Sequence, residues 1–105
     1  MHSMENLKRL PQLGKLSPKA TSGFWQYDQV ALSDGVIPKK YKELMAIAVA
    51  LTTQCVYCIA GHKQNALEAG ATKAEFAETI HVAAALRAGA AITHGTHLLN
   101  DKASG

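Results

Sequence analysis

The sequence has a small net charge and few aromatic residues. Its 105 residues carry a formal net charge of +3, and only 6% of them are Phe, Trp or Tyr. The basic residues are scattered, with the densest group at Lys39, Lys40 and Lys42, and no ladder of aromatic residues alternates with them. Nucleic-acid-binding surfaces combine a basic stripe with aromatic platforms. We therefore expect no nucleic-acid partner and interpret the lysines as a solvated surface.

Long hydrophobic runs are also missing. Residues 1–16 are polar and lack the continuous apolar stretch of a signal peptide. The longest apolar run, residues 44–51, is far shorter than the roughly 20 residues that a membrane-spanning helix needs. We expect a cytoplasmic protein with no membrane partner. In that compartment two cysteines are more often redox-active or metal-binding than a structural disulfide.

The composition that remains is typical of one folded domain. Apolar residues make up 48% of the chain and charged residues 18%, as in globular proteins. We divide the chain into an N-terminal segment of residues 1–16 and a single helical domain of residues 17–105. A domain of this size buries only a modest share of its surface, so it must pack efficiently or share its core with other copies.

Hydrophobic periodicity predicts an all-α fold, because no stretch shows sustained strand alternation. Residues 1–16 have no sustained period and predict no more than one helical turn, near residues 5–10. Ser17–Pro18 is typical of a helix start, and the turn residues 33–35 end this first helix. A second helix begins near Pro38. Its apolar face is formed by Leu44, Ile47, Ala48 and Leu51.

Two further helices complete a compact bundle. The third runs from about Cys55 to Gly70, where a glycine cap is expected. The fourth begins at Thr72 and Glu75, which have the spacing of a capping box. If this C-terminal helix runs unbroken to Leu99, it is about 40 Å long. Its alanine-rich surface suits close packing, and for so short a chain we expect part of it to lie in a homo-oligomer interface.

Residues 55–62 contain the side chains best suited to chemistry. On a helix, Cys55, Cys58 and His62 are spaced three and four residues apart, so they lie along one stripe. Free N–H groups and the helix dipole favour a thiolate at a helix N-terminus. His62 can take up or return its proton. The two sulfurs can form a disulfide if Cys55 lies in the frayed first turn.

Other interpretations of these residues stay open. Neighbouring free cysteines are often inert core residues. The pair can instead hold zinc with His62 and a fourth ligand, although the second well-spaced pair of most structural zinc sites is absent. Candidates for that ligand are His81, His94, His97 and Glu43. We expect no metal and no other cofactor.

The spacing of four residues carries a resemblance to a known family. Glu43 lies twelve residues before Cys55, and with Cys58 and His62 it forms the pattern E…C-x-x-C-x-x-x-H. In this pattern the sequence resembles alkylhydroperoxidase-D-like proteins, which belong to the wider carboxymuconolactone decarboxylase family. The resemblance covers about residues 36–99. It implies an all-helical fold, often assembled as trimers or hexamers, with a redox-active disulfide.

The resemblance also implies roles for these residues. Glu43 would connect to His62, directly or through water, and His62 would serve the cysteine pair. One cysteine would attack a peroxide or disulfide, and the other would resolve the intermediate. The resemblance favours Cys58 as the attacking thiol, because Cys58 lies one turn from His62. The helix-end argument alone favours Cys55.

One position departs from the family pattern. The peroxidase members carry a second histidine between the cysteines, where this chain has Tyr57. A tyrosine hydroxyl forms hydrogen bonds but does not shuttle protons near neutral pH, which weakens the prediction of peroxide reduction more than that of thiol–disulfide exchange. Tyr57 and His81 are supporting candidates only. We interpret Phe24, Trp25 and Tyr27 as core residues of a first helix that can also roof the active site.

Three hypotheses about function follow. The leading one is a thiol–disulfide oxidoreductase that reduces alkyl hydroperoxides through Cys55 and Cys58, with a Glu43–His62 proton relay. Its partners would be a peroxide or disulfide substrate and an unidentified thiol reductant. The second is a lactone enzyme of the carboxymuconolactone decarboxylase type, whose members generally lack the cysteine pair. The third is a non-catalytic oligomeric or metal-binding module.

Overall fold

The computed structural model describes residues 3–102, which form helices and no strand. In chain order the elements are the 3₁₀ helix η1 (Met4–Arg9), the α-helices α1 (Leu10–Leu16), α2 (Pro18–Leu32), α3 (Lys39–Thr53), α4 (Val56–Glu68) and α5 (Lys73–Gly95), and the 3₁₀ helix η2 (Thr96–Leu99). The predicted all-α class with a long C-terminal helix is confirmed. The division into residues 1–16 and 17–105 stays a prediction, and its outermost residues, 1–2 and 103–105, lie outside the described residues.

The N-terminal segment is more helical than its sequence pattern predicts. The pattern predicts one turn near residues 5–10, whereas η1 and α1 together span Met4 to Leu16. Two local signals explain the difference. The hydroxyl of Ser3 accepts a hydrogen bond from the N–H of Glu5 at 3.2 Å, and Pro11 occupies the first turn of α1, where its missing N–H costs nothing.

A left-handed residue separates α3 from α4. Gln54 has φ 60° and ψ 40°, and the N–H of Cys55 bonds to the carbonyl of Ala50 at 3.0 Å. This is a helix C-terminus of the type usually built on glycine, and the left-handed conformation costs a residue with a side chain about 1 kcal/mol. The turn reverses the chain so that α4 packs back against α3, with Cys55 as its first, capping residue.

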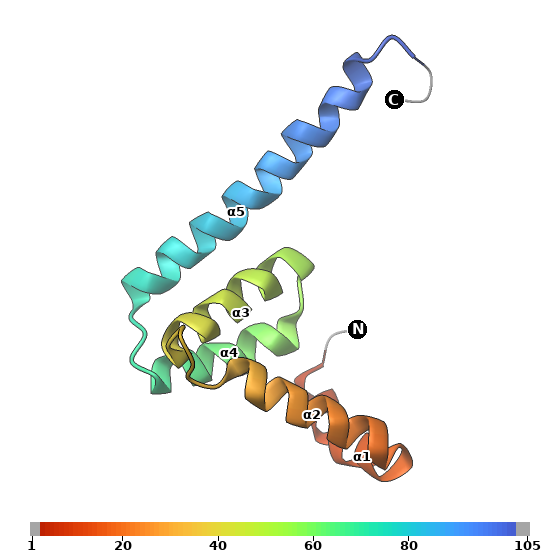
Figure 1. The fold of residues 1–105 in the computed structure, drawn as a ribbon, viewed down its shortest axis with the longest axis vertical. Coiled ribbons are helices and arrows are strands. Elements are labelled where there is room, and N and C mark those ends of the chain that lie inside the picture. The colour runs from red at the N-terminus through yellow and green to blue at the C-terminus, as the bar shows by residue number, and fades with distance from the viewer. Residues whose placement is uncertain (1–2, 103–105) are drawn as a thin grey trace.

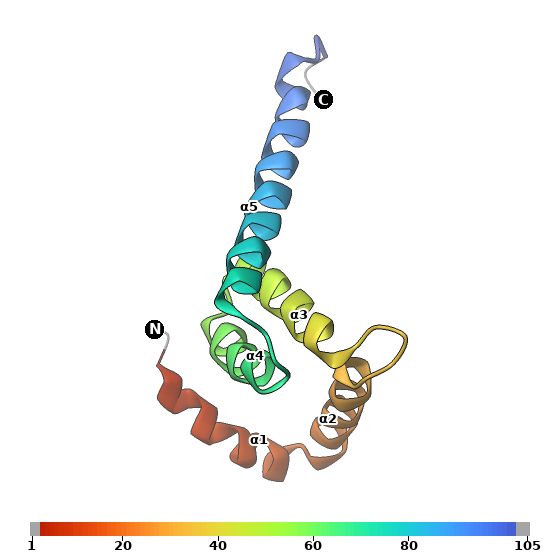
Figure 2. The same ribbon diagram turned by 90° about the vertical axis from the view of Figure 1, so that its left-hand side faces the viewer.

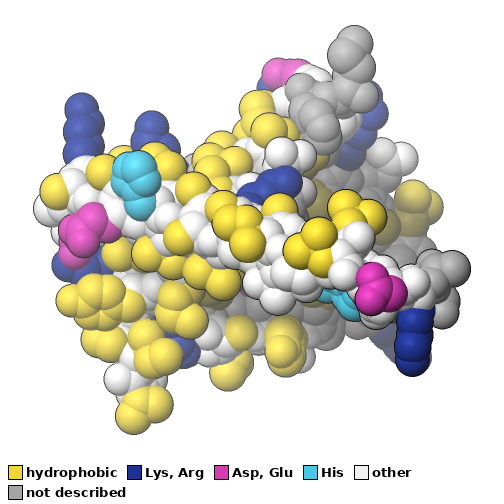
Figure 3. Space-filling model, turned by 90° about the horizontal axis from the view of Figure 1, so that it is seen from above, with side chains coloured by type: hydrophobic (Ala, Val, Ile, Leu, Met, Phe, Trp, Pro, Cys, Tyr) yellow, Lys and Arg dark blue, Asp and Glu magenta, His cyan; other side chains and the backbone are white. Residues whose placement is uncertain are grey.

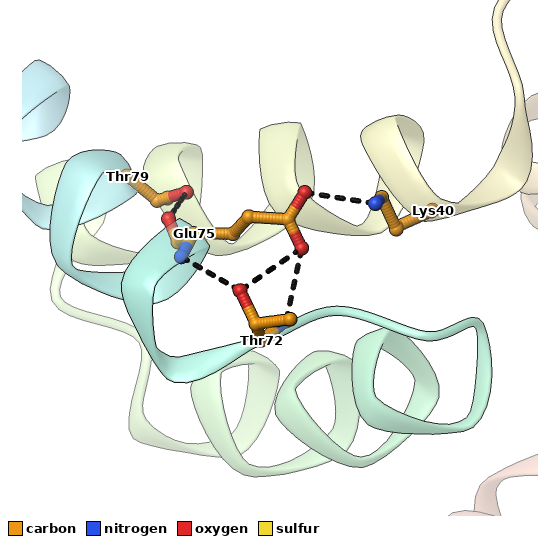
Figure 4. A network of polar contacts seen from close by, with 4 residues as sticks. All are labelled: Lys40, Thr72, Glu75 and Thr79. Carbon is orange, nitrogen blue, oxygen red and sulfur yellow. Dashed lines mark hydrogen bonds and ion pairs between the residues drawn. The ribbon is translucent and has the colours of Figure 1, made fainter.

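The capping box predicted for the fourth helix is present (Figure 4). The N–H of Glu75 donates to the hydroxyl of Thr72 at 3.2 Å, and the N–H of Thr72 donates to a Glu75 carboxylate oxygen at 2.9 Å. The other oxygen of Glu75 lies 2.8 Å from the Nζ of Lys40 on α3. This ion pair lowers the pKa of Glu75. One carboxylate therefore caps α5 and also ties its first turn to α3.

The core is small and lies where α3, α4 and α5 meet. Ile47, Ala66 and Ala71 are buried together, and Leu44, Leu51 and Phe76 pack against them. The helices η1 and α1 lie on the opposite side of the α3–α4 pair from α5 (Figures 1 and 2). From the site of this core, α5 projects away from the other helices. The interior is thus formed by three helices, and the outer part of α5 adds nothing to it.

The elongated shape leaves much apolar surface uncovered. The radius of gyration is 17.8 Å, against about 13 Å for a globular domain of this length. Large hydrophobic side chains are exposed on every helix, among them Val49, Leu86 and Ile92. Seen from above, hydrophobic side chains cover much of the visible face (Figure 3). No helix within residues 3–102 has the length and apolar character needed to cross a membrane.

Candidate active site

The two cysteines lie at the N-terminus of α4, as their spacing predicts. Cys55 is the capping residue, and its Sγ accepts a hydrogen bond from the N–H of Cys58 at 3.3 Å. The two Sγ atoms are 2.7 Å apart, and both cysteines are free thiols. A disulfide bond is about 2.05 Å long, so little movement separates this arrangement from an oxidised pair.

The contact between the two thiols makes them unequal acids. Donation of a hydrogen bond by Cys58 lowers the pKa of the Cys55 thiol, and the N–H groups at the start of α4 lower it further. The same hydrogen bond raises the pKa of Cys58 to about 11, with contributions from partial burial and from the negative charges of Cys55 and Asp28. The pair thus holds one negative charge most readily on Cys55.

Glu43 of α3 and His62 of α4 are joined by a direct hydrogen bond. The Nδ1 of His62 lies 2.6 Å from the Oε1 of Glu43. Glu43 is the largest fully buried side chain, at 1% exposure, and a carboxylate so removed from water needs a partner. With Nδ1 donating to Glu43, the Nε2 of His62 is the nitrogen that accepts or returns a proton.

A cavity of about 550 Å³ lies over Cys58 and His62. Its lining residues come from η1 and α1 (Asn6, Leu7, Leu10), from α2 (Phe24, Trp25, Asp28) and from α4 (Tyr57, Cys58, Gly61, His62, Asn65). Cys55 is not among them. Cys58 is therefore the sulfur that a molecule in the cavity would meet, with His62 one helical turn away on the same wall.

Comparison with known proteins agrees with this arrangement of helices. A sequence model of the carboxymuconolactone decarboxylase family matches residues 18–101. The chain belongs to the carboxymuconolactone decarboxylase family. The match begins at the start of α2, after the N-terminal segment, and it contains the pair Glu43–His62 and both cysteines. This family includes alkylhydroperoxidase-D-like members.

Three relatives illustrate the family likeness. An uncharacterized protein from the cox locus of Paracoccus denitrificans is 42% identical over 90 residues, which cover 83% of this chain and 81% of that protein. The apo structure of a carboxymuconolactone decarboxylase family protein from Legionella pneumophila is 35% identical with a TM-score of 0.74, and the similarity covers 78% of this chain and 73% of that one. A structure from Methanobacterium thermoautotrophicum is 31% identical with a TM-score of 0.74, covering 79% and 95%.

The site of this carboxymuconolactone decarboxylase family member includes residues that the sequence pattern does not reveal. Asn6, from η1, donates a hydrogen bond to the hydroxyl of Tyr57 at 3.0 Å, so the N-terminal segment forms part of the cavity. Phe24 and Trp25 are 55% and 46% exposed and line the cavity, and Tyr27 is exposed; the prediction that all three build the core is wrong. The alternative that the first helix roofs the site agrees with the structure. Asp28 also lines the cavity, and no motif in the sequence marks it.

The other histidines lie apart from this family member's cavity. His81 is exposed on α5 and is not among the residues that line it. The rings of His94 and His97 have centroids 6.2 Å apart near the far end of α5. Within residues 3–102, no group of three or more His, Cys, Asp or Glu side chains is placed to hold a metal ion. The structure therefore brings together Glu43, Cys55, Cys58, His62 and Tyr57, and leaves His81 outside.

Proposed function

We propose that this protein is a thiol–disulfide oxidoreductase that reduces organic hydroperoxides through Cys55 and Cys58. The observation that carries the proposal is the 2.7 Å approach of the two Sγ atoms at the N-terminus of α4, beside a cavity that contains Cys58 and His62. A dithiol at a helix N-terminus with one low-pKa thiol is the arrangement from which disulfides form readily. Membership of a family with alkylhydroperoxidase-D-like members supports it.

The two cysteines take different parts in this reaction. Cys58 faces the cavity, so it attacks the peroxide, but its pKa of about 11 means that it needs a base near neutral pH. His62 is that base, because its Nε2 is free to accept the proton while Nδ1 is held by Glu43. Cys55, whose pKa is lowered, supplies the thiolate for the second step.

The steps balance with one peroxide for each disulfide. The Cys58 sulfur attacks one peroxide oxygen, the O–O bond breaks, and the alkoxide leaves as an alcohol with the proton that His62 took from Cys58. The product at Cys58 is a sulfenic acid. The Cys55 thiolate then attacks the Cys58 sulfur, the S–O bond breaks, and hydroxide leaves as water with a proton from solvent. An external thiol restores the dithiol by exchange.

Mass spectrometry of the intact protein tests this proposal. The fully reduced chain is treated with a small excess of cumene hydroperoxide, and its mass is measured before and after. We expect the loss of two hydrogens, mapped to a peptide that links Cys55 to Cys58. The Cys55→Ser, Cys58→Ser double variant is the control and should keep its mass. An unchanged wild-type mass with both thiols free would refute the proposal.

A further inference from the structure

Asp28 is an isolated charge in the wall of the cavity. Among the described residues that line the cavity it is the single aspartate or glutamate, and no lysine or arginine lies there. Asp28 is half-buried. Within residues 3–102 its carboxylate forms no hydrogen bond or ion pair. No lysine or arginine in the cavity wall offsets its charge.

The periodicity of α2 directs Asp28 toward the cavity. Phe24, Trp25 and Asp28 are separated by three and four residues, so they share one face of α2, and all three line the cavity. Tyr27 and Val30, on other faces, are 76% and 72% exposed. The half-buried carboxylate therefore shares the cavity wall with two aromatic side chains, and a charge in a half-buried position acts more strongly than one on an open surface.

The field of Asp28 reaches the reacting sulfur. Its negative charge is one of the causes that raise the pKa of Cys58. A second negative charge brought next to Cys58 would meet the same repulsion, because the interaction of two like charges depends only on their separation and surroundings. Asp28 and Cys58 line the same cavity, so a substrate anion bound there shares the cavity with the Asp28 carboxylate.

The net charge of the whole chain has the opposite sign. The chain carries a formal charge of +3, which attracts anions at long range. The lysines near the start of α3, Lys39, Lys40 and Lys42, do not line the cavity. The chain as a whole therefore attracts anions, whereas the cavity repels them. Discrimination between charged and uncharged molecules takes place in the cavity.

We propose that Asp28 is a specificity-determining residue that restricts the cavity to uncharged, largely apolar organic hydroperoxides and excludes those that carry a carboxylate. This inference rests on the proposed function, since it names the substrate class of the same reaction. Leu7, Leu10, Phe24 and Trp25 supply an apolar wall for such a molecule. A volume of about 550 Å³ lies within the range of cavities that take small organic ligands.

A matched pair of substrates tests the inference. One is cumene hydroperoxide with a para-carboxylate, and the other is the methyl ester of the same compound. The rate of disulfide formation in the full, reduced chain is measured by rapid mixing for each. Each rate is divided by the rate of the same hydroperoxide with dithiothreitol, which removes differences in intrinsic reactivity. We expect the wild type to favour the ester by about tenfold or more.

Variants test whether the preference for the ester depends on the carboxylate of Asp28. Asp28→Asn should lower the ester-to-acid ratio toward one, whereas Asp28→Glu, which keeps the charge, should retain most of it. Glu68→Gln removes one negative charge from the exposed surface of α4, away from the cavity, and should leave the ratio unchanged. Circular dichroism and the Tm of each variant establish that it is folded.

The outcomes separate this inference from the proposed function. A wild type that oxidises with both compounds at a ratio near one would overturn the role of Asp28 and leave the hydroperoxide reaction standing. That role is equally overturned if Asp28→Asn keeps the wild-type ratio, or if Glu68→Gln lowers it as much as Asp28→Asn does. A wild type in which neither compound forms the Cys55–Cys58 disulfide would overturn the proposed function itself.

Discussion

At the scale of single residues, the burial of Glu43 determines how His62 can act. The carboxylate is 1% exposed and holds the Nδ1 of His62 at 2.6 Å. This contact fixes the orientation of the imidazole ring and stabilises the imidazolium that forms when His62 accepts a proton. The pair therefore links α3 to α4, and in the proposed mechanism it serves the cysteines as a proton relay.

Substitution of either member of the pair should slow oxidation without unfolding the protein. His62→Gln keeps a side chain that can donate to Glu43 but loses the base, so we expect the rate with cumene hydroperoxide to fall by about 100-fold. Glu43→Gln keeps the hydrogen bond and loses the charge, and we expect a fall of about tenfold. Both rates are measured by rapid mixing at pH 7. Unchanged rates across the pH range would remove the relay from the mechanism.

The unequal acidity of the two thiols predicts a pH profile. Because the hydrogen bond from Cys58 stabilises the thiolate of Cys55 and lowers its pKa, alkylation of Cys55 by iodoacetamide should reach half its maximum rate below the pH of an ordinary cysteine. Cys58→Ala removes the donor, so the midpoint for Cys55 should move to higher pH. Cys58→Ser keeps a hydroxyl donor and should move it less. Peptide mapping follows the reaction at each site.

If the midpoints of the wild type and Cys58→Ala coincide, the thiol–thiol hydrogen bond does not control the acidity of Cys55. The helix N-terminus would then be the only remaining cause, since the N–H of Cys58 still points at the Cys55 sulfur at 3.3 Å.

At the scale of elements, the first turn of α5 depends on Thr72 and Glu75. Their reciprocal hydrogen bonds satisfy two N–H groups that have no partner within the helix. The ion pair of Glu75 with Lys40 joins the first turn of α5 to α3 (Figure 4). Glu75 thus takes part both in the cap of α5 and in the contact of α5 with α3. Substitutions in this turn therefore test how much the cap contributes to stability.

Thr72→Ala should lower the free energy of unfolding by about 1 kcal/mol, the usual cost of losing an N-cap side chain. Thr72→Ser keeps the hydroxyl and should be close to the wild type. Urea unfolding followed by circular dichroism measures both. Thr72 is not among the residues that line the cavity, so the oxidation rate of Thr72→Ala should not change. Equal stability of the alanine and serine variants would contradict the role given to the cap.

At the scale of the whole molecule, α5 leaves large apolar side chains exposed. The described residues measure 54 × 36 × 30 Å, and large apolar side chains of α5 such as Val82, Leu86 and Ile92 are exposed. Monomeric proteins rarely leave contiguous apolar surface of this kind in water. We propose that α5 lies in an interface between copies of this chain, in a trimer or hexamer as the family resemblance implies.

Light scattering coupled to gel filtration should therefore report a mass that is a multiple of the 11.2 kDa chain. Ile92→Asp places a charge on the exposed apolar surface of α5 and should shift the mass toward that of one chain, because a buried unpaired charge is costly. Lys63→Asp, on the exposed surface of α4, is the control and should keep the assembly. A wild-type mass equal to one chain at micromolar concentration would contradict this interface.

Much of the fold could be predicted from local patterns. Three features depend only on residues close together in the chain, and the structure contains them: the start of α2 at Pro18, the capping box at Thr72 and the apolar face of α3. The helices of the N-terminal segment could not be predicted, because their leucines are exposed and so follow no buried period. The turn at Gln54 lacks the glycine that normally marks it.

The same distinction holds for the site. Sequence spacing by itself determined that Cys55, Cys58 and His62 share one side of α4, because neighbours on a helix follow from its period. Tertiary structure alone decided that Asn6 reaches Tyr57 and that Asp28 of α2 lines the same cavity as Cys58. It also decided the burial of Glu43 against His62, a contact that the family resemblance implies but that no local spacing predicts. These contacts join residues far apart in the chain, and their existence depends on how helices pack, which no local period encodes.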